Sequence, residues 1–249
     1  MTEMARTTPT ISIVIPMKNE AENAGPLLAE IAGVAGDLPD CEVIVVDDGS
    51  ADGTASEVRR HATADPRIRL LRHPWTGGQS AAVHSGVLAA RGAIVATLDG
   101  DGQNPPAELP KLVAPLLAPG SDAVGLVAGQ RIGRQDRLSR RLASHFANRL
   151  RAWLLNDRIR DTGCGLKAFR RDAFLALPYF DHMHRYLPAL FKRAGWQVAL
   201  VDVTHRPRLA GRSNYTNLHR ALVGIHDLIG IAWLIRRHKK VRPLPEAEG

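Results

Sequence analysis

The 249-residue sequence lacks the features that mark several large classes of protein. Its two cysteines, Cys41 and Cys164, lie too far apart to set up a disulfide framework or a zinc-binding spacing. The first nine residues are polar and no long apolar segment follows them, so no signal peptide is expected. There is no zinc-finger or RNA-recognition signature, and the histidines show no zinc-ligand spacing. These absences favour a reduced, cytoplasmic protein without a nucleic-acid partner.

Positive charge, in contrast, is abundant. The net charge is +8 at pH 7 and the isoelectric point is about 10.1. Arginines are concentrated between residues 131 and 160, and a basic run extends from Arg236 to Lys240. The composition is otherwise that of a globular chain, long enough to bury the core of one α/β domain. An anionic partner is therefore expected, such as a phosphorylated lipid or a membrane surface.

Apolar, β-branched segments alternate with helical patterns through the first half of the chain. Strands are expected at residues 10–16, 41–46, 67–71 and 93–98. Helices are expected between them at residues 22–34, 52–58 and 77–90, the second with Asp52 as its cap. This alternation predicts an α/β fold with a mostly parallel, Rossmann-like sheet covered by helices on both faces.

The second half has a less regular pattern. Helices are expected over residues 105–116, 137–155, 187–194 and 218–237, and strands over residues 122–128 and 196–205. The helix at 137–155 is long, basic and amphipathic. The last helix is apolar in its middle but contains His226 and Asp227, and its apolar part is shorter than the roughly 20 residues that span a bilayer. Trp233 and the basic run after it are typical of a helix in the lipid headgroup layer, although a helix docked on the protein's own core is equally compatible.

Acidic residues follow three of the predicted strands. Glu20 follows the first strand, Asp47 and Asp48 the second, and Asp99 and Asp101 the fourth. The carboxyl ends of parallel strands share one edge of a sheet, where ligands bind. Negative charge gathered at one edge is costly unless a cation or a donor-rich ligand is bound there. The two carboxylates at 99 and 101 would face the same side and suit Mg²⁺ or Mn²⁺ carrying a diphosphate.

The segments around these acids resemble glycosyltransferase family 2 of the GT-A fold, in its polyprenyl-phosphate (dolichyl-phosphate mannose synthase-like) branch. The matching segments are IVIPMKNE at 13–20, VVDDGSADGT at 45–54 and LDGDGQNPP at 98–106, followed by segments 129–131, 161–167, 184–188 and 208–215. They occur in family order from about residue 11 to residue 216. Each segment alone is a weak signal, whereas the ordered set is specific.

The resemblance implies a division of the chain. A GT-A catalytic domain is expected over 11–216, with a nucleotide-sugar-binding half at 11–130 and an acceptor half at 131–216. A flexible N-terminus (1–10), an amphipathic membrane-interface helix (217–240) and a disordered tail (241–249) would flank it. The paired transmembrane helices of many relatives are missing, so membrane access is expected through the terminal helix or a separate integral membrane subunit.

The resemblance also assigns roles to residues. The nucleoside of the donor is expected at Pro16, Lys18, Glu20, Asp47 and Asp48. The diphosphate and its Mg²⁺ or Mn²⁺ are expected at Asp99, Gly100, Asp101 and Gln103, with Asp99, Asp101 and Gln103 as metal ligands. Two arginines, Arg131 and Arg208, are expected to contact phosphates and complete the catalytic set with Asp99 and Asp101. The acceptor side is expected to include Asp161, Lys167, Arg185, Ser213 and Asn214.

Some positions depart from the family pattern or have a second interpretation. Lys18 replaces a tyrosine that is frequent in the family, which removes a ring that could stack on the base. Asn214 replaces a common lysine and weakens the prediction of phosphate binding there. Asp161 can alternatively cap the turn at residues 162–163.

The function implied by the resemblance is inverting transfer of a hexose from a GDP- or UDP-sugar to a polyprenyl phosphate at the inner face of the membrane. A lipid phosphate is already anionic, so the enzyme would need positioning and charge stabilisation rather than a strong base. Transfer to a hydroxyl of a glycan or glycolipid would require a carboxylate base. A non-catalytic nucleotide-sugar-binding subunit is a further alternative. A dinucleotide-dependent dehydrogenase is disfavoured because the first strand does not end in a glycine-rich turn.

Overall fold

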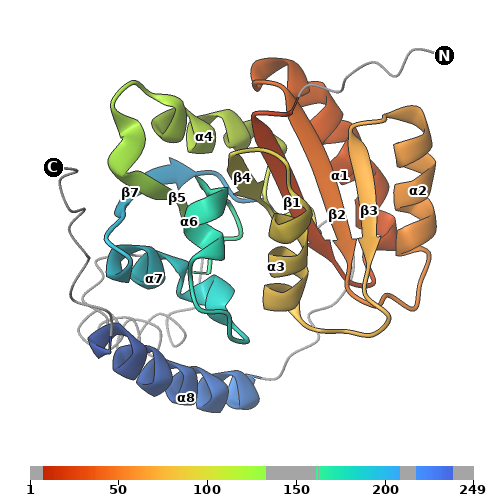
Figure 1. Cartoon of the computed structure of the whole chain (residues 1–249). Helices are drawn as coiled ribbons and strands as arrows, with labels where there is room; N and C mark the ends of the chain where they lie inside the picture. The colour runs from red at the N-terminus through yellow and green to blue at the C-terminus, as the bar shows by residue number, and fades with distance from the viewer. Residues whose placement is uncertain (1–7, 133–160, 162, 208–216, 238–249) are drawn as a thin grey trace, which may run out of the picture.

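The computed structural model describes residues 8–132, 161, 163–207 and 217–237, with the side chains of the last helix described from residue 226 onward. The described residues form a seven-stranded sheet in the order β3-β2-β1-β4-β6-β5-β7 (Figure 1). The strands are β1 (Ile11–Met17), β2 (Cys41–Asp47), β3 (Ile68–Arg72), β4 (Ile94–Thr97), β5 (Val124–Arg131), β6 (Lys167–Arg170) and β7 (Gln197–Val203). Neighbouring strands are parallel, except that β6 runs antiparallel to both β4 and β5. The predicted mostly parallel α/β sheet is therefore confirmed.

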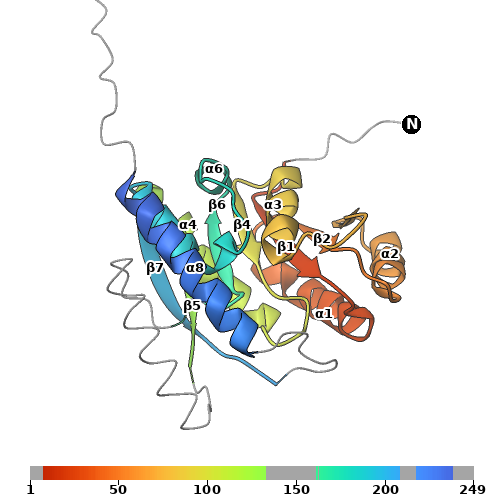
Figure 2. The ribbon, with the colours of Figure 1, turned by 90° about the horizontal axis from the view of Figure 1, so that it is seen from below.

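The described helices cover both faces of this sheet. They are α1 (Ala21–Val34), α2 (Thr54–Ala64), α3 (Gln79–Ala89), α4 (Leu109–Leu117), α6 (Arg171–Leu175), α7 (Leu187–Arg193) and α8 (Asn217–Arg236), with short 3₁₀ turns η1 (Ala35–Asp37), η2 (Pro106–Glu108), η3 (Ser121–Ala123) and η4 (Met183–Arg185). Figure 2 looks onto the carboxyl ends of the parallel strands and shows α3 and α6 on one side of the sheet and α1 on the other. The predicted helix at 137–155 lies outside the described residues.

Alternation along β1 explains why two cores form. Ile11, Ile13 and Ile15 pack on one face against helices α1, α2 and α4. Val14 faces the other side, in a core that includes residues of α3, α6, α7 and α8. Successive side chains of a strand point to opposite faces, so an uninterrupted apolar strand requires cover on both sides. The strand β6 was not predicted, because it is only four residues long and has a basic residue at each end.

Helix α8 packs against the domain with one face. Leu228, Ile231 and Ala232 are buried in the second core, and the Nδ1 atom of His182 lies 3.1 Å from Oδ2 of Asp227. The opposite face exposes Ile229 and Trp233, whose side chains are 65% and 61% exposed. Docking on the protein's own core therefore accounts for one face of α8 and leaves an apolar ridge on the other. Within the described ranges, no helix combines the length and apolar character needed to cross a membrane.

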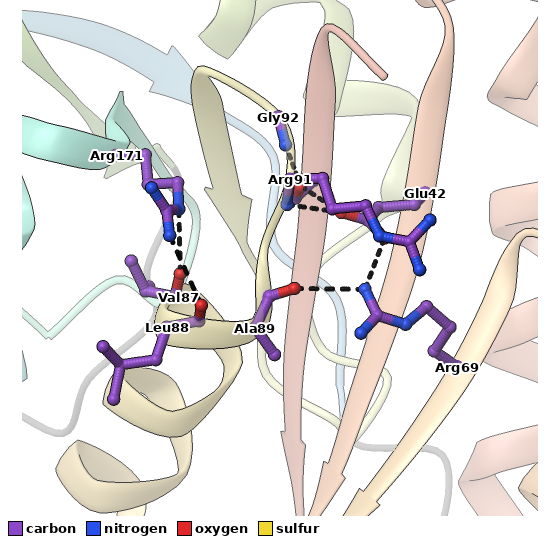
Figure 3. A network of polar contacts seen from close by, with 9 residues as sticks. Glu42, Arg69, Val87, Leu88, Ala89, Arg91, Gly92 and Arg171 are labelled. Carbon is purple, nitrogen blue, oxygen red and sulfur yellow. Dashed lines mark hydrogen bonds and ion pairs between the residues drawn. The ribbon is translucent and has the colours of Figure 1, made fainter. Parts of the chain in front are cut away.

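A buried acid holds the amino-terminal edge of the sheet together (Figure 3). Glu42 on β2 accepts hydrogen bonds from the Ser12 hydroxyl at 2.8 Å and from the Arg91 backbone N–H at 2.7 Å. It also forms an ion pair with Arg69 at 2.7 Å. Its carboxylate is thus provided with donors from three segments, as a buried charge requires.

The same network fixes the carboxyl end of α3. Arg69 donates to the Ala89 carbonyl at 3.1 Å. Arg171 donates to the carbonyls of Val87 and Leu88 at 3.2 and 3.3 Å (Figure 3). The last carbonyls of a helix have no partners within it and carry partial negative charge, so two guanidinium groups stabilise this end. The other end of α3 is thereby directed toward the carboxyl edge of the sheet.

Replacing Glu42 with glutamine is expected to lower the free energy of unfolding by about 2–4 kcal/mol near neutral pH, because Arg69 loses its buried partner. Burial raises the pKa of Glu42, but hydrogen bonds from Arg91, Arg69 and Ser12 outweigh it and hold the pKa below its usual 4.5. A lowered folded-state pKa contributes stability above the usual value that is lost as the pH falls through the folded value. The difference between wild type and Glu42→Gln should therefore shrink in acid.

Urea denaturation at about pH 7 and about pH 4 measures this difference. Glu57→Gln is the matched control, since its carboxylate forms an ion pair with Arg60 on the surface of α2 and should change stability by less than about 1 kcal/mol. Equal effects of the two substitutions would contradict the role assigned to Glu42.

Candidate active site

A cleft of about 770 Å³ opens at the carboxyl ends of β1 and β4, within the usual range of small-molecule sites. It is bounded by these strand ends, the start of α3, the turn before β6 and η4. The predicted site residues that line it are Pro16, Lys18, Glu20, Asp48, Asp99, Gly100, Asp101, Gln103, Arg131, Lys167 and Arg185. Asp47 and Asp161 are not among its lining residues. Arg208, Ser213 and Asn214 lie outside the described residues.

Asp99 is held in the cleft by three separate segments. Its Oδ1 accepts a hydrogen bond from the Gln79 side chain at 2.7 Å, and its Oδ2 accepts one from Asn104 at 3.2 Å. Gly165 packs so closely on the carboxylate that a Cβ atom at that position would collide with it. Burial and then the negative charge of Asp101 raise the pKa of Asp99. The carboxylate is therefore fixed in place but electrostatically costly, as expected where a cation binds.

The second acid lies in a tight turn. The Oδ1 atom of Asp101 accepts the Gln103 backbone N–H at 3.1 Å, and Gly102 between them has a φ of 73°, in the left-handed region that glycine tolerates. Gly100 packs on the end of β1, where a Cβ atom would lie 2.9 Å from the Pro16 carbonyl oxygen. These contacts hold the acid pair close to the first strand.

The residues of this turn fit a divalent cation shared with a substrate. Two carboxylates and a side-chain amide are hard oxygen donors of the kind that Mg²⁺ and Mn²⁺ take. The described part of the chain contains no cluster of three or more acidic, histidine or cysteine side chains that could hold a metal alone. An ion bound at Asp99, Asp101 and Gln103 would therefore need additional oxygens, as in sites where Mg²⁺ takes substrate phosphates.

Asp48 shapes the connection between β3 and α3. Its two oxygens accept hydrogen bonds from Thr76 Oγ1 at 2.8 Å and from the N–H groups of Gly77 and Gly78 at 2.8 and 2.9 Å. The His73 ring contacts it at 2.7 Å. Burial raises the pKa of Asp48, but the hydrogen bonds from Gly77, His73, Thr76 and Gly78 outweigh burial and lower it. Asp48 thus lines the cleft, and the hydrogen bonds that its carboxylate accepts hold the connection between β3 and α3 in place.

Asp47 has a different place from its neighbour. Its side chain is fully buried and accepts the Ser50 N–H at 3.0 Å and the Arg72 Nε–H at 3.1 Å. It therefore stabilises the turn after β2 from inside.

Glu20 lines the cleft and accepts a hydrogen bond from the Asn23 side chain at 2.5 Å. The predicted cap Asp52 accepts backbone N–H groups at the start of both α1 and α2.

Basic residues also line the cleft. Arg131 pairs with Asp161 through two hydrogen bonds, 2.5 Å from Nε to Oδ2 and 2.9 Å from the terminal nitrogen to Oδ1. Asp161 also accepts the Gly163 N–H at 3.1 Å, so it caps the turn and orients the arginine. Lys167 is buried and its Nζ donates to the Cys164 carbonyl. Burial lowers the pKa of Lys167, against the opposing charge of Asp99.

Three further residues complete the site and were not predicted. Gln79, at the start of α3, contacts Asp99 as described above. His184 lines the cleft, and its Nδ1 lies 2.7 Å from the Ser80 hydroxyl. Burial, followed by the positive charges of Lys167 and Arg185, lowers the pKa of His184 well below 6.5, so its ring is neutral near pH 7. Arg206 contacts the turn after Asp101. Segment 184–188 belongs to the family resemblance, which predicted a role only for Arg185.

The seven-stranded fold is shared with solved GT-A structures. Its structure superimposes on mannosyl-3-phosphoglycerate synthase from Rubrobacter xylanophilus with a TM-score of 0.72, covering 96% of this chain and 79% of that chain at 20% identity. Glucosyl-3-phosphoglycerate synthase from Mycobacterium tuberculosis gives a TM-score of 0.69, covering 91% of this chain and 80% of that chain at 24% identity. Similarity at these identities establishes the GT-A fold.

Residues 12–177 match the family model described as glycosyl transferase family 2, and the chain belongs to that family. It is 33% identical to dodecaprenyl-phosphate galacturonate synthase of Rhizobium johnstonii, over 94% of this chain and 69% of that protein. It is 36% identical to undecaprenyl-phosphate 4-deoxy-4-formamido-L-arabinose transferase of Pectobacterium carotovorum subsp. carotovorum, over 84% of this chain and 63% of that protein. The chain thus spans about two thirds of the length of these relatives. The resemblance to the polyprenyl-phosphate branch is confirmed.

Replacing Gly165 with alanine is expected to displace Asp99 from its hydrogen bonds with Gln79 and Asn104, because the added Cβ occupies the position of the carboxylate. Displacing a residue that orients a metal site typically lowers metal affinity by about 10–100-fold. Titration with Mn²⁺ followed by electron paramagnetic resonance, in the presence of UDP or GDP, measures the effect.

Gly33→Ala is the control, since a Cβ atom at that position of α1 meets nothing within 4 Å. It should leave Mn²⁺ binding unchanged. Wild-type Mn²⁺ affinity in Gly165→Ala would show that the position of Asp99 does not matter to the ion.

Proposed function

We propose that this protein transfers a sugar from a nucleoside diphosphate sugar to a polyprenyl phosphate, with Mg²⁺ or Mn²⁺ bound at Asp99, Asp101 and Gln103. The observation that carries the proposal is a cleft lined by an acid pair together with Arg131, Lys167 and Arg185. Such a cleft suits a metal-bound diphosphate next to a second phosphate. The relatives named above act on dodecaprenyl phosphate and undecaprenyl phosphate, and the solved GT-A structure from M. tuberculosis contains Mn²⁺ and UDP.

On the donor side, different residues of the cleft would bind the nucleoside, the metal ion and the phosphates. Pro16, Lys18 and Glu20 would receive the nucleoside, beside the connection that Asp48 holds. Asp99 and Asp101 would hold the ion, which when bound neutralises charge on the leaving diphosphate. Arg131 lines the cleft and is held in place by its two bonds to Asp161, so it can pair with phosphate oxygens without first losing conformational freedom. Arg208 stays a predicted phosphate contact.

On the acceptor side, the described lining residues of the cleft offer positive charge and no suitable base. The carboxylates among its described lining residues are Glu20, Asp48, Asp99 and Asp101, all at the nucleoside or metal end. His184 has a lowered pKa and is bonded to Ser80. A phosphate oxygen is anionic at neutral pH and needs orientation by cations rather than deprotonation. This favours a phosphate acceptor over a hydroxyl, and attack opposite the diphosphate would invert the anomeric carbon. Ser213 and Asn214 stay predicted acceptor contacts.

The identity of the sugar is proposed only as a class. The sequence predicted a hexose and a mannosyltransferase-like activity. The two relatives are named for galacturonate and for 4-deoxy-4-formamido-L-arabinose, the second of which is a modified pentose. We therefore extend the proposed donor to nucleotide-activated sugars other than simple hexoses, with UDP or GDP as the nucleotide.

The protein is further proposed to work at the cytoplasmic face of a membrane, with α8 at the surface. Figures 1 and 2 place α8 at the end of the molecule where the parallel strands have their carboxyl ends. The exposed ridge of Ile229 and Trp233 is followed by Arg236 and Arg237, which are also exposed. An apolar ridge next to cationic side chains fits the interface of an anionic bilayer. A separate integral membrane subunit is compatible with this arrangement.

Asp101→Asn is expected to reduce sugar transfer to undecaprenyl phosphate by at least about 100-fold, because it removes one negative ligand from the proposed metal site. The measurement is label from nucleotide sugars that becomes extractable into organic solvent, across a panel of UDP- and GDP-sugars. Asp122→Asn, at an exposed position of η3, is the control and should retain activity.

Unchanged transfer by Asp101→Asn would rule out the proposed role of that aspartate. If the wild type binds nucleotide and Mn²⁺ but transfers no sugar from any donor, the non-catalytic binding subunit becomes the better account.

Replacing both Ile229 and Trp233 with alanine is expected to weaken binding to phosphatidylglycerol vesicles by about tenfold or more, since two apolar side chains no longer enter the interface. Vesicle flotation measures the bound fraction. Leu88→Ala removes a side chain that is 55% exposed at the far end of α3 and serves as the matched control. Equal flotation of the double variant and wild type would show that this face of α8 does not contribute to membrane binding.

A further inference from the structure

The turn that follows Asp101 is held from outside by Arg206, a residue that follows β7. The backbone N–H of Arg206 donates to the Gln103 carbonyl at 3.1 Å, and its Nε–H donates to the Gly102 carbonyl at 2.5 Å. A terminal nitrogen of the same guanidinium lies 2.9 Å from Oε1 of Glu30 on α1. Arg206 thus joins three segments that are far apart in the sequence.

A second contact strengthens the same junction. The hydroxyl and backbone N–H of Thr204 donate to Oε1 of Glu108 at 2.7 and 3.3 Å. Glu108 is buried in η2, five residues after Gln103. The segment 204–206 is therefore attached at two points to the stretch of chain that begins with the acid pair. The Thr204–Glu108 contacts thus anchor the backbone two residues before Arg206.

The two sides of the turn have different partners. On one side, the Gln103 N–H faces the carboxylate of Asp101. On the other, the carbonyls of Gly102 and Gln103 face Arg206. Gly102 needs a left-handed backbone to make this possible, and glycine also has the largest conformational freedom to lose. Hydrogen bonds from Arg206 stabilise that one conformation and so fix where Asp101 and Gln103 lie before any ion arrives.

The ion pair with Glu30 resolves an electrostatic conflict. A guanidinium group close to a cation site would repel the cation, and this repulsion is stronger where water is partly excluded. Glu30 balances the charge of Arg206 at 2.9 Å and leaves its N–H groups available to the two carbonyls. The arrangement therefore gives the turn its donors without a net positive charge beside the proposed metal site.

We propose that Arg206 is a positioning residue for the metal site: it presets the turn at residues 101–103 for a divalent cation shared with a diphosphate. This inference rests on the proposed function, because it assumes that the acid pair binds the ion. The family resemblance predicted no role for Arg206. Loss of Arg206 should raise the dissociation constant for the ion, and saturating metal should restore most of the turnover.

The experiment titrates Mn²⁺ into the full-length protein in the presence of UDP, and separately of GDP, with free Mn²⁺ followed by electron paramagnetic resonance. Arg206→Ala is expected to weaken Mn²⁺ binding by about tenfold, at the lower end of the usual effect of residues that orient metal ligands. Arg206→Lys should fall between wild type and Arg206→Ala, since one ammonium group cannot reproduce the planar fork of donors. Arg60→Ala, which removes an exposed ion pair on α2, is the matched control and should bind Mn²⁺ as wild type does.

A second readout separates positioning from loss of structure. In transfer assays, Arg206→Ala should require about tenfold more Mn²⁺ for half-maximal activity, while kcat at saturating Mn²⁺ stays within about threefold of wild type. A variant that is merely less stable would lose kcat and melting temperature without a change in metal requirement. If Arg206→Ala does not fold, Arg206→Lys and Glu30→Gln are used in its place. Weaker Mn²⁺ binding by these variants supports the proposal, and wild-type Mn²⁺ binding by both overturns it.

Wild-type Mn²⁺ affinity in a folded Arg206→Ala variant also overturns the proposal, and it leaves the proposed sugar transfer intact. Failure of the proposed function has a different signature, in which the wild type itself neither binds Mn²⁺ with a nucleotide nor transfers a sugar.

Discussion

The position of β1 between two parallel neighbours is the constraint on which the site depends. Met17 at the end of β1 pairs with Asp47 of β2, and Val14 pairs with Thr97 of β4. Because all three strands run in the same direction, the chain segments that leave them emerge at one edge. This register brings Glu20, Asp48 and the acid pair at 99 and 101 around one cleft, where α/β sheets commonly bind ligands. A strand in the opposite direction at any of these positions would separate Glu20 and Asp48 from the acid pair.

Helix α3 links this edge to the opposite one. At its carboxyl end, Arg69 and Arg171 bind the last carbonyls, and Arg69 also pairs with the buried Glu42. At its other end, Gln79 contacts Asp99 and Ser80 contacts His184. The ionic network that stabilises the amino-terminal edge of the sheet therefore also determines where Gln79 lies in the cleft. Stability and site geometry are coupled through one rigid element, and η4 is attached to the same helix through His184.

The parts of this structure that could be predicted from sequence are those encoded by local patterns. Apolar runs identified β1, β2 and β4, and the acids after them identified the edge that carries the cleft. The four-residue strand β6 has no such pattern, because its pairing with β4 and β5 supplies the stability that its own sequence lacks. Contacts such as Gln79 with Asp99 and Arg206 with Gly102 join residues 20 and 104 positions apart, and only tertiary packing brings them together. Asp47 and Asp48 are adjacent in sequence, yet one is fully buried and the other lines the cleft.

The acceptor is proposed to be a phosphate, bound beside a metal-bound diphosphate in a cleft whose described lining residues provide no base at the acceptor end. Phosphorus magnetic resonance of lipid extracted after incubation with undecaprenyl phosphate, Mn²⁺ and a panel of nucleotide sugars tests it most directly. With a phosphate acceptor, the phosphomonoester signal of the lipid is expected to be replaced by a phosphodiester signal as nucleoside diphosphate is released. Release of nucleoside diphosphate and attachment of the sugar elsewhere, with the lipid phosphomonoester unchanged, would contradict it.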